Sequence, residues 1–134
     1  MTKVKDPLFI FHYQYKLKKK ILVIDDDEGI VDALQIFLEA SGFNVETSRK
    51  AEEIFDRIDK FKPDVVLLDV LMSGIDGRQI CKKLKADTNT KKVPVVMISA
   101  HPSAHKSITD SGAEAFLAKP FETSELLQII AQVT

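Results

Sequence analysis

Five polar residues stand at the ends of four short apolar stretches of this sequence: Asp25, Asp26, Asp69, Ser99 and Lys119. Three of them are acids, and two carboxylates about 4 Å apart repel by ~1 kcal/mol in water and ~4 kcal/mol at an effective dielectric of about 20. A cluster of these acids therefore requires a cation. Mg²⁺, which prefers hard oxygen ligands and keeps several waters, suits a shallow carboxylate edge better than zinc does.

The same side chains have the composition of a phosphoryl-transfer site. A carboxylate can act as the nucleophile, while a metal ion, a lysine ammonium and a serine hydroxyl can neutralise the phosphoryl oxygens. Each residue alone has a simpler explanation: a turn residue for Ser99, a solvated charge for Lys119, and helix caps for acids such as Asp27 and Asp76. Their placement at one strand end after another favours a shared site.

Five short strands, alternating with helices, are predicted to bring these side chains together. The strands are expected at residues 21–24, 43–47, 64–69, 94–98 and 115–118. Helices are expected between them, closing at Gly42, near Phe61, near Ala86 and at Gly112, with a last one after Thr123 or Ser124. Helical crossovers make neighbouring strands parallel and place helices on both faces. The predicted fold class is therefore α/β, a doubly wound five-stranded parallel sheet whose ligands lie beyond the carboxyl ends of the strands.

Residues with short polar side chains mark the expected helix starts. The predicted caps are Asp26 or Asp27 for the first helix, Ser48 for the second, and Thr123 or Ser124 for the last. A loop containing Gly74 and Gly77 is expected after Asp69.

Length and composition limit the classes of function. A chain of 134 residues with 45% hydrophobic and 29% charged residues is typical of one globular domain. The net charge of −1 predicts no general attraction to nucleic acid or to anionic membranes. No apolar stretch approaches the ~18 residues of a membrane span, so a cytoplasmic protein is expected. The single cysteine, Cys81, excludes an internal disulfide and is expected to be a buried small hydrophobic residue.

Residues 1–19 differ from the rest, which divides the chain into this extension and a domain of residues 20–134. The stretch from Leu8 to Tyr15 is aromatic and apolar and is flanked by lysines. The extension fits a flexible tail, and it also fits an extra strand or a self-association arm.

The motifs match a known family over about residues 19–134. The matching residues are Ile21–Asp26, Asp69 with Met72 and Asp76-Gly77 after it, Ser99-Ala100, and Lys119-Pro120-Phe121. This set resembles the receiver domain of two-component response regulators. The resemblance implies a flavodoxin-like, CheY-like fold with the strand order 2-1-3-4-5.

The resemblance also implies a role for each site residue. Asp69 would accept a phosphoryl group from the phosphohistidine of a sensor histidine kinase or a histidine phosphotransfer protein. Mg²⁺ would be bound by Asp25, Asp26, Asp69 and the backbone carbonyl of Leu71. Ser99 and Lys119 would each contact a phosphoryl oxygen, and the Lys119–Pro120 peptide would be cis.

Phosphorylation would act as a switch in a signalling domain that is not a turnover enzyme. Phe116 matches the switch aromatic of the family, which turns inward when Ser99 moves toward the phosphate. The change would bias the conformation of Phe116 and of the face near Ile108 and Leu126, and this face would bind an unknown effector. The chain would be a monomer or would form a dimer that depends on phosphorylation. The kinase would lie beside the exposed side of the first helix, with Asp32, Gln35 and Glu39.

The sequence departs from the family pattern at three places. Ser73 replaces the proline that usually follows Met72. The segment from Ala100 to Gly112 is about two residues short and contains Pro102, which predicts a short or mobile helix there and puts the usual signalling face of the family in question. The chain ends at Thr134 without an output domain, so both a stand-alone regulator and an excised receiver fit.

Three other functions compete with that of a phosphorylated receiver domain. A phosphatase of the haloacid dehalogenase type would use Asp25 as nucleophile, but it needs an acidic pair at a late strand end, where this chain has Ser99-Ala100 and Lys119-Pro120. Flavin binding is disfavoured because three acids after the first strand would repel the cofactor phosphate. A receiver-like module that signals by binding alone stays open, and chemistry at Asp69 would distinguish it.

Overall fold

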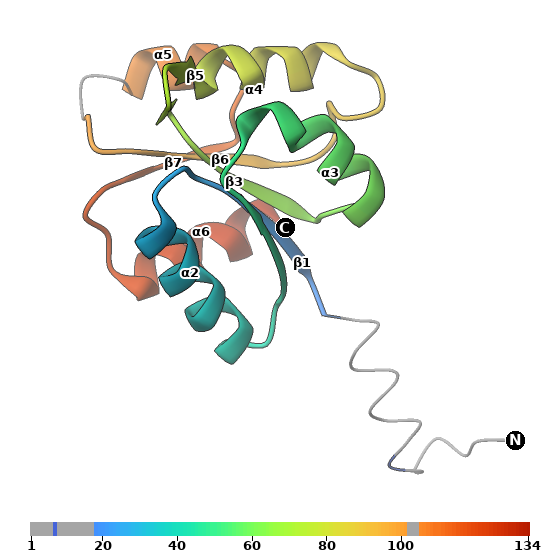
Figure 1. Ribbon diagram of the computed structural model, residues 1–134, viewed down its shortest axis with the longest axis vertical. Coiled ribbons are helices and arrows are strands. Elements are labelled where there is room, and N and C mark those ends of the chain that lie inside the picture. Colours follow the sequence, from blue (N-terminus) through green and yellow to red (C-terminus); the bar gives the residue numbers. More distant parts are fainter. Residues whose placement is uncertain (1–6, 8–17, 102–104) are drawn as a thin grey trace, which may run out of the picture.

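The computed structural model describes residue 7 and residues 18–101 and 105–134, and it has a parallel sheet at its centre (Figure 1). The sheet order is β2-β1-β3-β6-β7, with every neighbouring pair parallel. Its strands are β1 (Lys20–Ile24), β2 (Asn44–Ser48), β3 (Val65–Asp69), β6 (Val95–Ser99) and β7 (Ala115–Ala118). The predicted doubly wound α/β fold and the order 2-1-3-4-5 are confirmed.

Burial explains why the central strands are apolar on both faces. Every residue of β3 and β6 is buried, as are the last four of β1, because helices cover both faces of the sheet. The edge strand β2 has partly exposed residues between buried ones, as its mixed sequence predicts.

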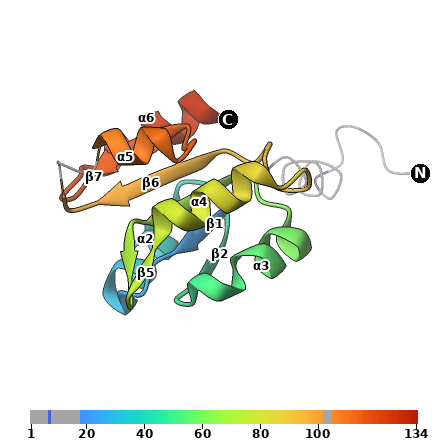
Figure 2. The same ribbon diagram turned by 90° about the horizontal axis from the view of Figure 1, so that it is seen from above.

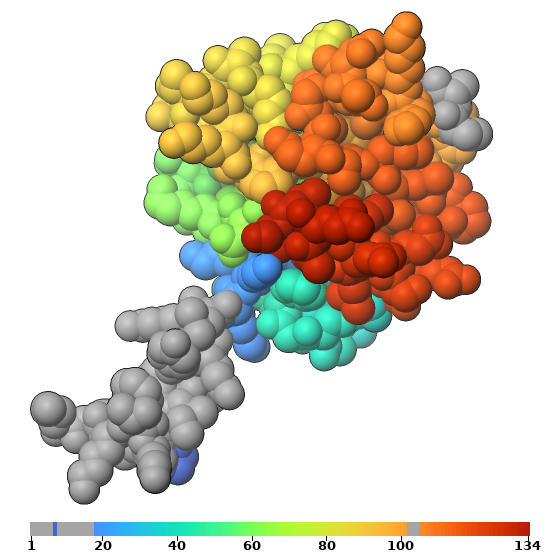
Figure 3. Space-filling model, turned by 180° about the vertical axis from the view of Figure 1, so that it is seen from behind, coloured from blue at the N-terminus to red at the C-terminus, as the bar shows by residue number. Residues whose placement is uncertain are grey.

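The helices divide between the two faces of the sheet (Figure 1), and Figure 2 looks onto one of these faces. One face is covered by α2 (Glu28–Ala40) and α6 (Thr123–Val133), whose buried residues share a cluster with Ile21, Val23 and Leu67. The other face is covered by η1 (Ala51–Glu53), α3 (Ile54–Phe61), α4 (Gly77–Ala86) and α5 (His105–Asp110). Figure 3 shows α6, in red, on the outer surface of the first face. None of the helices within the described residues is long and apolar enough to cross a membrane.

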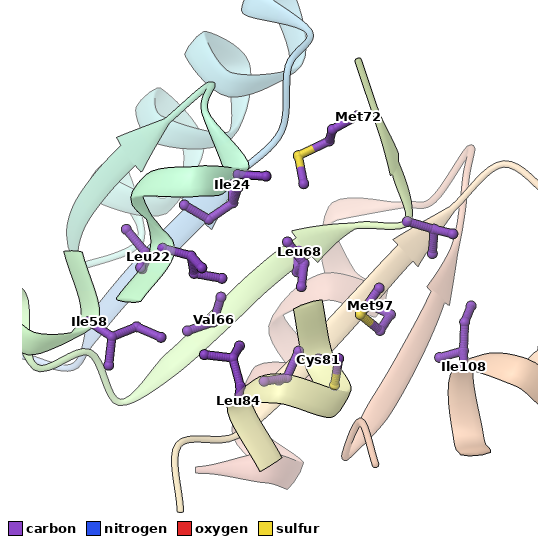
Figure 4. Close-up of a cluster of buried hydrophobic side chains, with 14 residues drawn as sticks. Leu22, Ile24, Ile58, Val66, Leu68, Met72, Cys81, Leu84, Met97 and Ile108 are labelled. Carbon is purple, nitrogen blue, oxygen red and sulfur yellow. The ribbon is translucent and has the colours of Figure 1, made fainter. Parts of the chain in front are cut away.

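The second cluster forms the larger core under α3, α4 and α5 (Figure 4). Side chains of alternate strand residues, such as Leu22, Val66 and Met97, pack there against Ile58, Leu84 and other helical residues. Cys81 is fully buried in this cluster, and burial raises the pKa of its thiol. The expectation of a buried small hydrophobic residue is confirmed.

Two of the three predicted helix caps are wrong. Asp27 does cap α2, accepting a hydrogen bond from the Ile30 N–H. Lys50, not Ser48, holds the cap position of η1, although the Ser48 hydroxyl accepts from the Lys50 N–H at 3.1 Å. At α6 the cap is Glu122, because its carboxylate and that of Glu125 bond each other's backbone N–H groups in a capping box.

The segment after β3 is a small hairpin instead of the expected loop. Strands β4 (Leu71–Met72) and β5 (Ile75–Asp76) pair antiparallel, and Ser73 and Gly74 form the turn between them. Farther on, α5 has six residues and ends before Gly112, in agreement with the short helix that was predicted. The predictions for Pro102 and for the segment from Leu8 to Tyr15 fall outside the described residues.

Candidate functional site

Three carboxylates meet at the carboxyl edge of the sheet. The parallel pairing of β1 and β3 places Ile24 opposite Leu68, so the next residues along each strand, Asp25 and Asp69, end side by side. One carboxylate oxygen from each of Asp25, Asp26 and Asp69 lies within 4.8 Å of the other two. Asp25 is 2% exposed and Asp69 is 9% exposed. The predicted acidic cluster is therefore present.

Lys119 compensates part of this negative charge. Its Nζ lies 3.1 Å from Oδ2 of Asp25 and 3.4 Å from Oδ1 of Asp69. It follows the edge strand β7, and its peptide bond to Pro120 is cis, as the resemblance implied. Burial by itself disfavours the ammonium, but the contacts with Asp25 and Asp69 outweigh it and raise the pKa of Lys119.

The charged form of Asp69 is disfavoured in this environment. Burial, followed by the charge of Asp25, raises the pKa of Asp69 from the ordinary 3.8 to about 6, while Lys119 opposes the shift. Asp69 is thus mostly an anion at neutral pH, available as a nucleophile, but held at an energetic cost that a bound cation would relieve.

Ser99 ends β6, the strand beside β3, and its side chain is buried. Its hydroxyl accepts a hydrogen bond from the His101 N–H at 3.0 Å and donates to the His101 carbonyl at 3.4 Å. A small cavity of about 130 Å³ opens here; it is lined by Asp69, Val70, Leu71, Ser99, Ala100, His101 and Lys119. Four predicted site residues thus share one cavity, with roughly the space of four waters in the liquid.

The cluster of three carboxylates is suited to bind a hard divalent cation. Asp25, Asp26 and Asp69 offer three oxygen ligands within one small volume, and the ammonium of Lys119 lies against Asp25 and Asp69. Oxygen-only ligands and excess negative charge suit Mg²⁺ better than zinc or copper.

The predicted switch aromatic lies next to the short helix. Phe116 is half-buried against the cluster of Figure 4, and its ring stacks on that of His105 with centroids 5.1 Å apart. Ile108 and Leu126, near which a signalling face is predicted, do not themselves line a surface. Both are fully buried, in the two clusters on opposite sides of the sheet, so neither is a surface group.

The exposed side of α2 agrees largely with expectation. Asp32 and Glu39 are exposed, while Gln35 is half-buried and donates a hydrogen bond to Glu39 at 3.1 Å.

The hairpin contributes contacts that sequence reasoning missed. Ser73 donates two hydrogen bonds to the carboxylate of Asp26, from its N–H at 2.9 Å and its hydroxyl at 3.0 Å. The sequence showed only that Ser73 replaces a proline. Asp76, as predicted for a cap, accepts from the Arg78 N–H at 2.9 Å and pairs with the Arg78 guanidinium.

Known proteins resemble this chain over most of its length. The alkaline phosphatase synthesis transcriptional regulatory protein PhoP of Bacillus subtilis is 36% identical over 82% of the chain and 46% of its own length. The phosphate regulon transcriptional regulatory protein PhoB of Rhizobium meliloti is 32% identical over 81% of the chain and 48% of its own length. The chain therefore spans about half the length of these curated relatives.

Solved structures agree with the sequence matches. A response regulator from Chloroflexus aurantiacus has a TM-score of 0.81 at 33% identity, covering 87% of this chain and 97% of that one. The chemotaxis protein CheY4 of Vibrio cholerae has a TM-score of 0.80 at 27% identity, covering 87% and 99%. The family model described as the response regulator receiver domain matches residues 21–131. The chain belongs to the response regulator receiver domain family of two-component signalling.

Proposed function

We propose that Asp69 of this chain accepts a phosphoryl group in a Mg²⁺-dependent reaction and so controls a two-state switch. One observation carries the proposal: the cavity beside Asp69 is also lined by Lys119 and Ser99, and the carboxylates of Asp25 and Asp26 lie close to that of Asp69. A nucleophile, a cation and a hydroxyl are thus within one small space, which is what phosphoryl transfer requires.

The donor we propose is the phosphohistidine of a sensor histidine kinase or a histidine phosphotransfer protein. A carboxylate oxygen of Asp69 attacks phosphorus, an O–P bond forms, the N–P bond breaks, and the imidazole leaves with its electron pair. Because the pKa of Asp69 is about 6, most molecules carry the required anion at pH 7.

Mg²⁺ would be held by the carboxylates of Asp25, Asp26 and Asp69 and by the backbone carbonyl of Leu71. When bound, the ion supplies positive charge against the carboxylates and the phosphoryl oxygens. Lys119, half-buried beside Asp69, would donate to one phosphoryl oxygen. Ser99 would exchange its bonds with the His101 backbone for one to another oxygen.

An apolar groove beside the site is suited to the phosphodonor protein. It has a volume of about 510 Å³ and runs between α2 and the start of α6. Lys119 belongs to both the groove and the cavity at Asp69, so a partner helix lying in the groove would bring its histidine close to Asp69. The groove is lined by Ile30, Ala33, Phe37, Lys119, Pro120 and Phe121, among others.

The output would reach an effector protein through Phe116 and α5, with no direct nucleic acid or membrane contact by residues 20–134. Loss of the Ser99–His101 bonds would free the backbone that leads from β6 toward α5. Phe116, stacked on His105 of α5, would then change its packing. The chain would then be a phosphoacceptor that assists its own phosphorylation and dephosphorylation, and it would not turn over a separate substrate.

Intact-mass spectrometry after incubation with acetyl phosphate tests the proposal. The expected result is a single phosphoryl adduct that requires Mg²⁺, is absent from Asp69→Asn, and is retained by Asp56→Asn, a control at an exposed helical site. No adduct, together with no Mg²⁺-dependent beryllofluoride complex, would overturn the proposal in favour of a module that signals by binding alone. Multiple turnover of a phosphomonoester would instead indicate a phosphatase.

A further inference from the structure

Ser73 contacts the metal-site carboxylate that Lys119 does not reach. Lys119 bonds Asp25 and Asp69, and the Asp27 N–H also donates to Asp25. Asp26 stands apart: the hydrogen bonds to its carboxylate within the described residues come from Ser73, both to the same oxygen, Oδ2, at 2.9 and 3.0 Å.

The backbone of the hairpin turn makes this double contact available. Ser73 has φ of +46° and Gly74 has φ of +81°, the positive values at both central positions that a type I′ turn requires. A proline at position 73 would be fixed near φ of −65° and would have no N–H. The contact therefore depends on a residue that has a backbone donor and tolerates this left-handed conformation.

The contact also joins two segments that the metal site needs. Asp26 lies in the loop between β1 and α2, whereas Ser73 follows β4, whose residue Leu71 lines the cavity at Asp69. The two hydrogen bonds from Ser73 fix the rotamer of the half-exposed Asp26 side chain before a cation binds. Less side-chain entropy is therefore lost when the cation binds. They also occupy Oδ2, which leaves Oδ1 for the cation.

We propose that Ser73 is a positioning residue that holds the carboxylate of Asp26 ready for Mg²⁺. The proposal rests on the proposed function, because it takes Asp26 as a metal ligand. Groups that orient metal ligands in this way typically change metal affinity about 10–100-fold when removed. Ser73 is such a group, supplied by the hairpin of this chain.

Four variants separate the parts of this contact. Ser73→Ala removes the hydroxyl and keeps the N–H, and it should weaken Mg²⁺ binding by roughly 3–10-fold. Ser73→Pro removes both donors and should weaken it by about 10–100-fold. Ser73→Asn keeps the N–H, offers an amide donor and tolerates positive φ, so it should bind within about threefold of the parent. Ser41→Ala, at an exposed hydroxyl that bonds the Phe37 carbonyl at the end of α2, is the control and should bind like the parent.

The measurement is a Mg²⁺ titration followed by amide NMR shifts of Asp26, Asp69 and Ser73, with dissociation constants checked by calorimetry. A structural role alone would lower thermal stability without acting through Asp26, so the titration is repeated in an Asp26→Ala background, which has no side-chain acceptor for Ser73. There, Ser73→Ala should have no further effect on Mg²⁺ affinity.

The failures of the two proposals are distinguishable. A parent protein that binds no Mg²⁺ at millimolar concentration contradicts the proposed function itself. A parent that binds Mg²⁺ while Ser73→Ala binds equally tightly, or a Ser73→Ala effect that persists in the Asp26→Ala background, overturns the positioning role of Ser73 alone.

Discussion

Asp69 is a buried carboxylate whose ionised form is disfavoured until a cation approaches it. Asp25 repels it and Lys119 attracts it, and burial contributes more than either. Without metal the folded state therefore carries an unfavourable charge at neutral pH. The negative charge that makes Asp69 a nucleophile therefore lowers the stability of the metal-free fold.

Removing the charge of Asp69 should stabilise the metal-free protein. Because the folded-state pKa, about 6, exceeds the ordinary 3.8, the folded form binds more protons between these values, and parent stability falls as the pH rises through this window. Asp69→Asn lacks this titration. Its free energy of unfolding should exceed that of the parent by on the order of 1–3 kcal/mol above pH 6, with no difference below about pH 4.

Urea unfolding in EDTA from pH 4 to pH 8 measures this effect. The control is Asp56→Asn, which alters an exposed ion pair with Lys60 on α3 and should follow the parent curve at every pH. An Asp69→Asn protein that is no more stable than the parent at pH 7 would show that the charge of Asp69 does not destabilise the folded state.

At the scale of elements, the start of α4 is packed directly against the backbone of Asp69. The Gly77 N–H donates to the Val70 carbonyl at 2.6 Å, and Asp76 caps the helix. A Cβ on Gly77 would come well inside 3.0 Å of the Asp69 carbonyl oxygen, a separation that real Cβ atoms essentially never show. The glycine therefore lets the helix approach the strand end that carries Asp69.

Gly77→Ala should accordingly destabilise the fold and displace Asp69. Because the obstructing atom is backbone, relief requires movement of β3 or α4, and we expect a loss of about 1–3 kcal/mol in the free energy of unfolding. Chemical denaturation and the amide shift of Asp69 report the two effects.

Gly29→Ala is the matched comparison for that variant. Gly29 also lies in the first turn of a helix, but its added Cβ would meet only a side-chain oxygen of Asp27, at 3.3 Å. Its stability should stay within about 1 kcal/mol of the parent, since alanine is the better helix former. Equal losses at the two positions would remove the argument for a special packing constraint at Gly77.

At the scale of the whole molecule, the paired strands β6 and β7 form a path from the site to the short helix α5. Ser99 bonds the His101 backbone, and β7 then presents Phe116 to His105 of α5. The opposite edge, with β2 and α3, is separated from this path by β1 and β3. A signal that starts at Ser99 is therefore expected to leave through β7 and α5.

Amide NMR spectra with and without Mg²⁺ and beryllofluoride test this direction. Shifts should extend from residues 25, 26 and 69 to His101, His105 and Phe116, while Val45 and Ile58 stay nearly unchanged. Phe116→Ala, which keeps the phosphoryl pocket, should bind beryllofluoride yet lose the shift at His105. Changes confined to the immediate site in the parent would contradict the switch.

The boundary at residue 20 can be tested by truncation. Within the described residues, both hydrophobic clusters are built from side chains between Ile21 and Val133. A protein lacking residues 1–18 should therefore have a melting temperature within about 2 °C of the full chain and the same oligomeric mass by light scattering. A large loss of stability or a smaller oligomer would instead assign residues 1–18 to the fold or to a self-association arm.

Local patterns in the sequence determined the fold and the chemical composition of the site. Apolar runs such as residues 65–68 predict buried strands, because only a strand covered on both faces tolerates them. Since helical crossovers make the strands parallel, the residues that follow each strand must meet at one edge. Asp25, Asp26, Asp69, Ser99 and Lys119 could be grouped for that reason alone.

The tertiary structure decided what depends on contacts between residues distant in the chain. The pairing of Ser73 with Asp26 and the stacking of Phe116 on His105 arise from packing between elements. Such contacts leave no periodic or local signal. The cap Glu122 was missed because a capping box competes with the simpler preference for Thr123 or Ser124. Residue types and their order thus identify the side chains that can carry out the chemistry, whereas the three-dimensional packing determines which other residues orient those side chains.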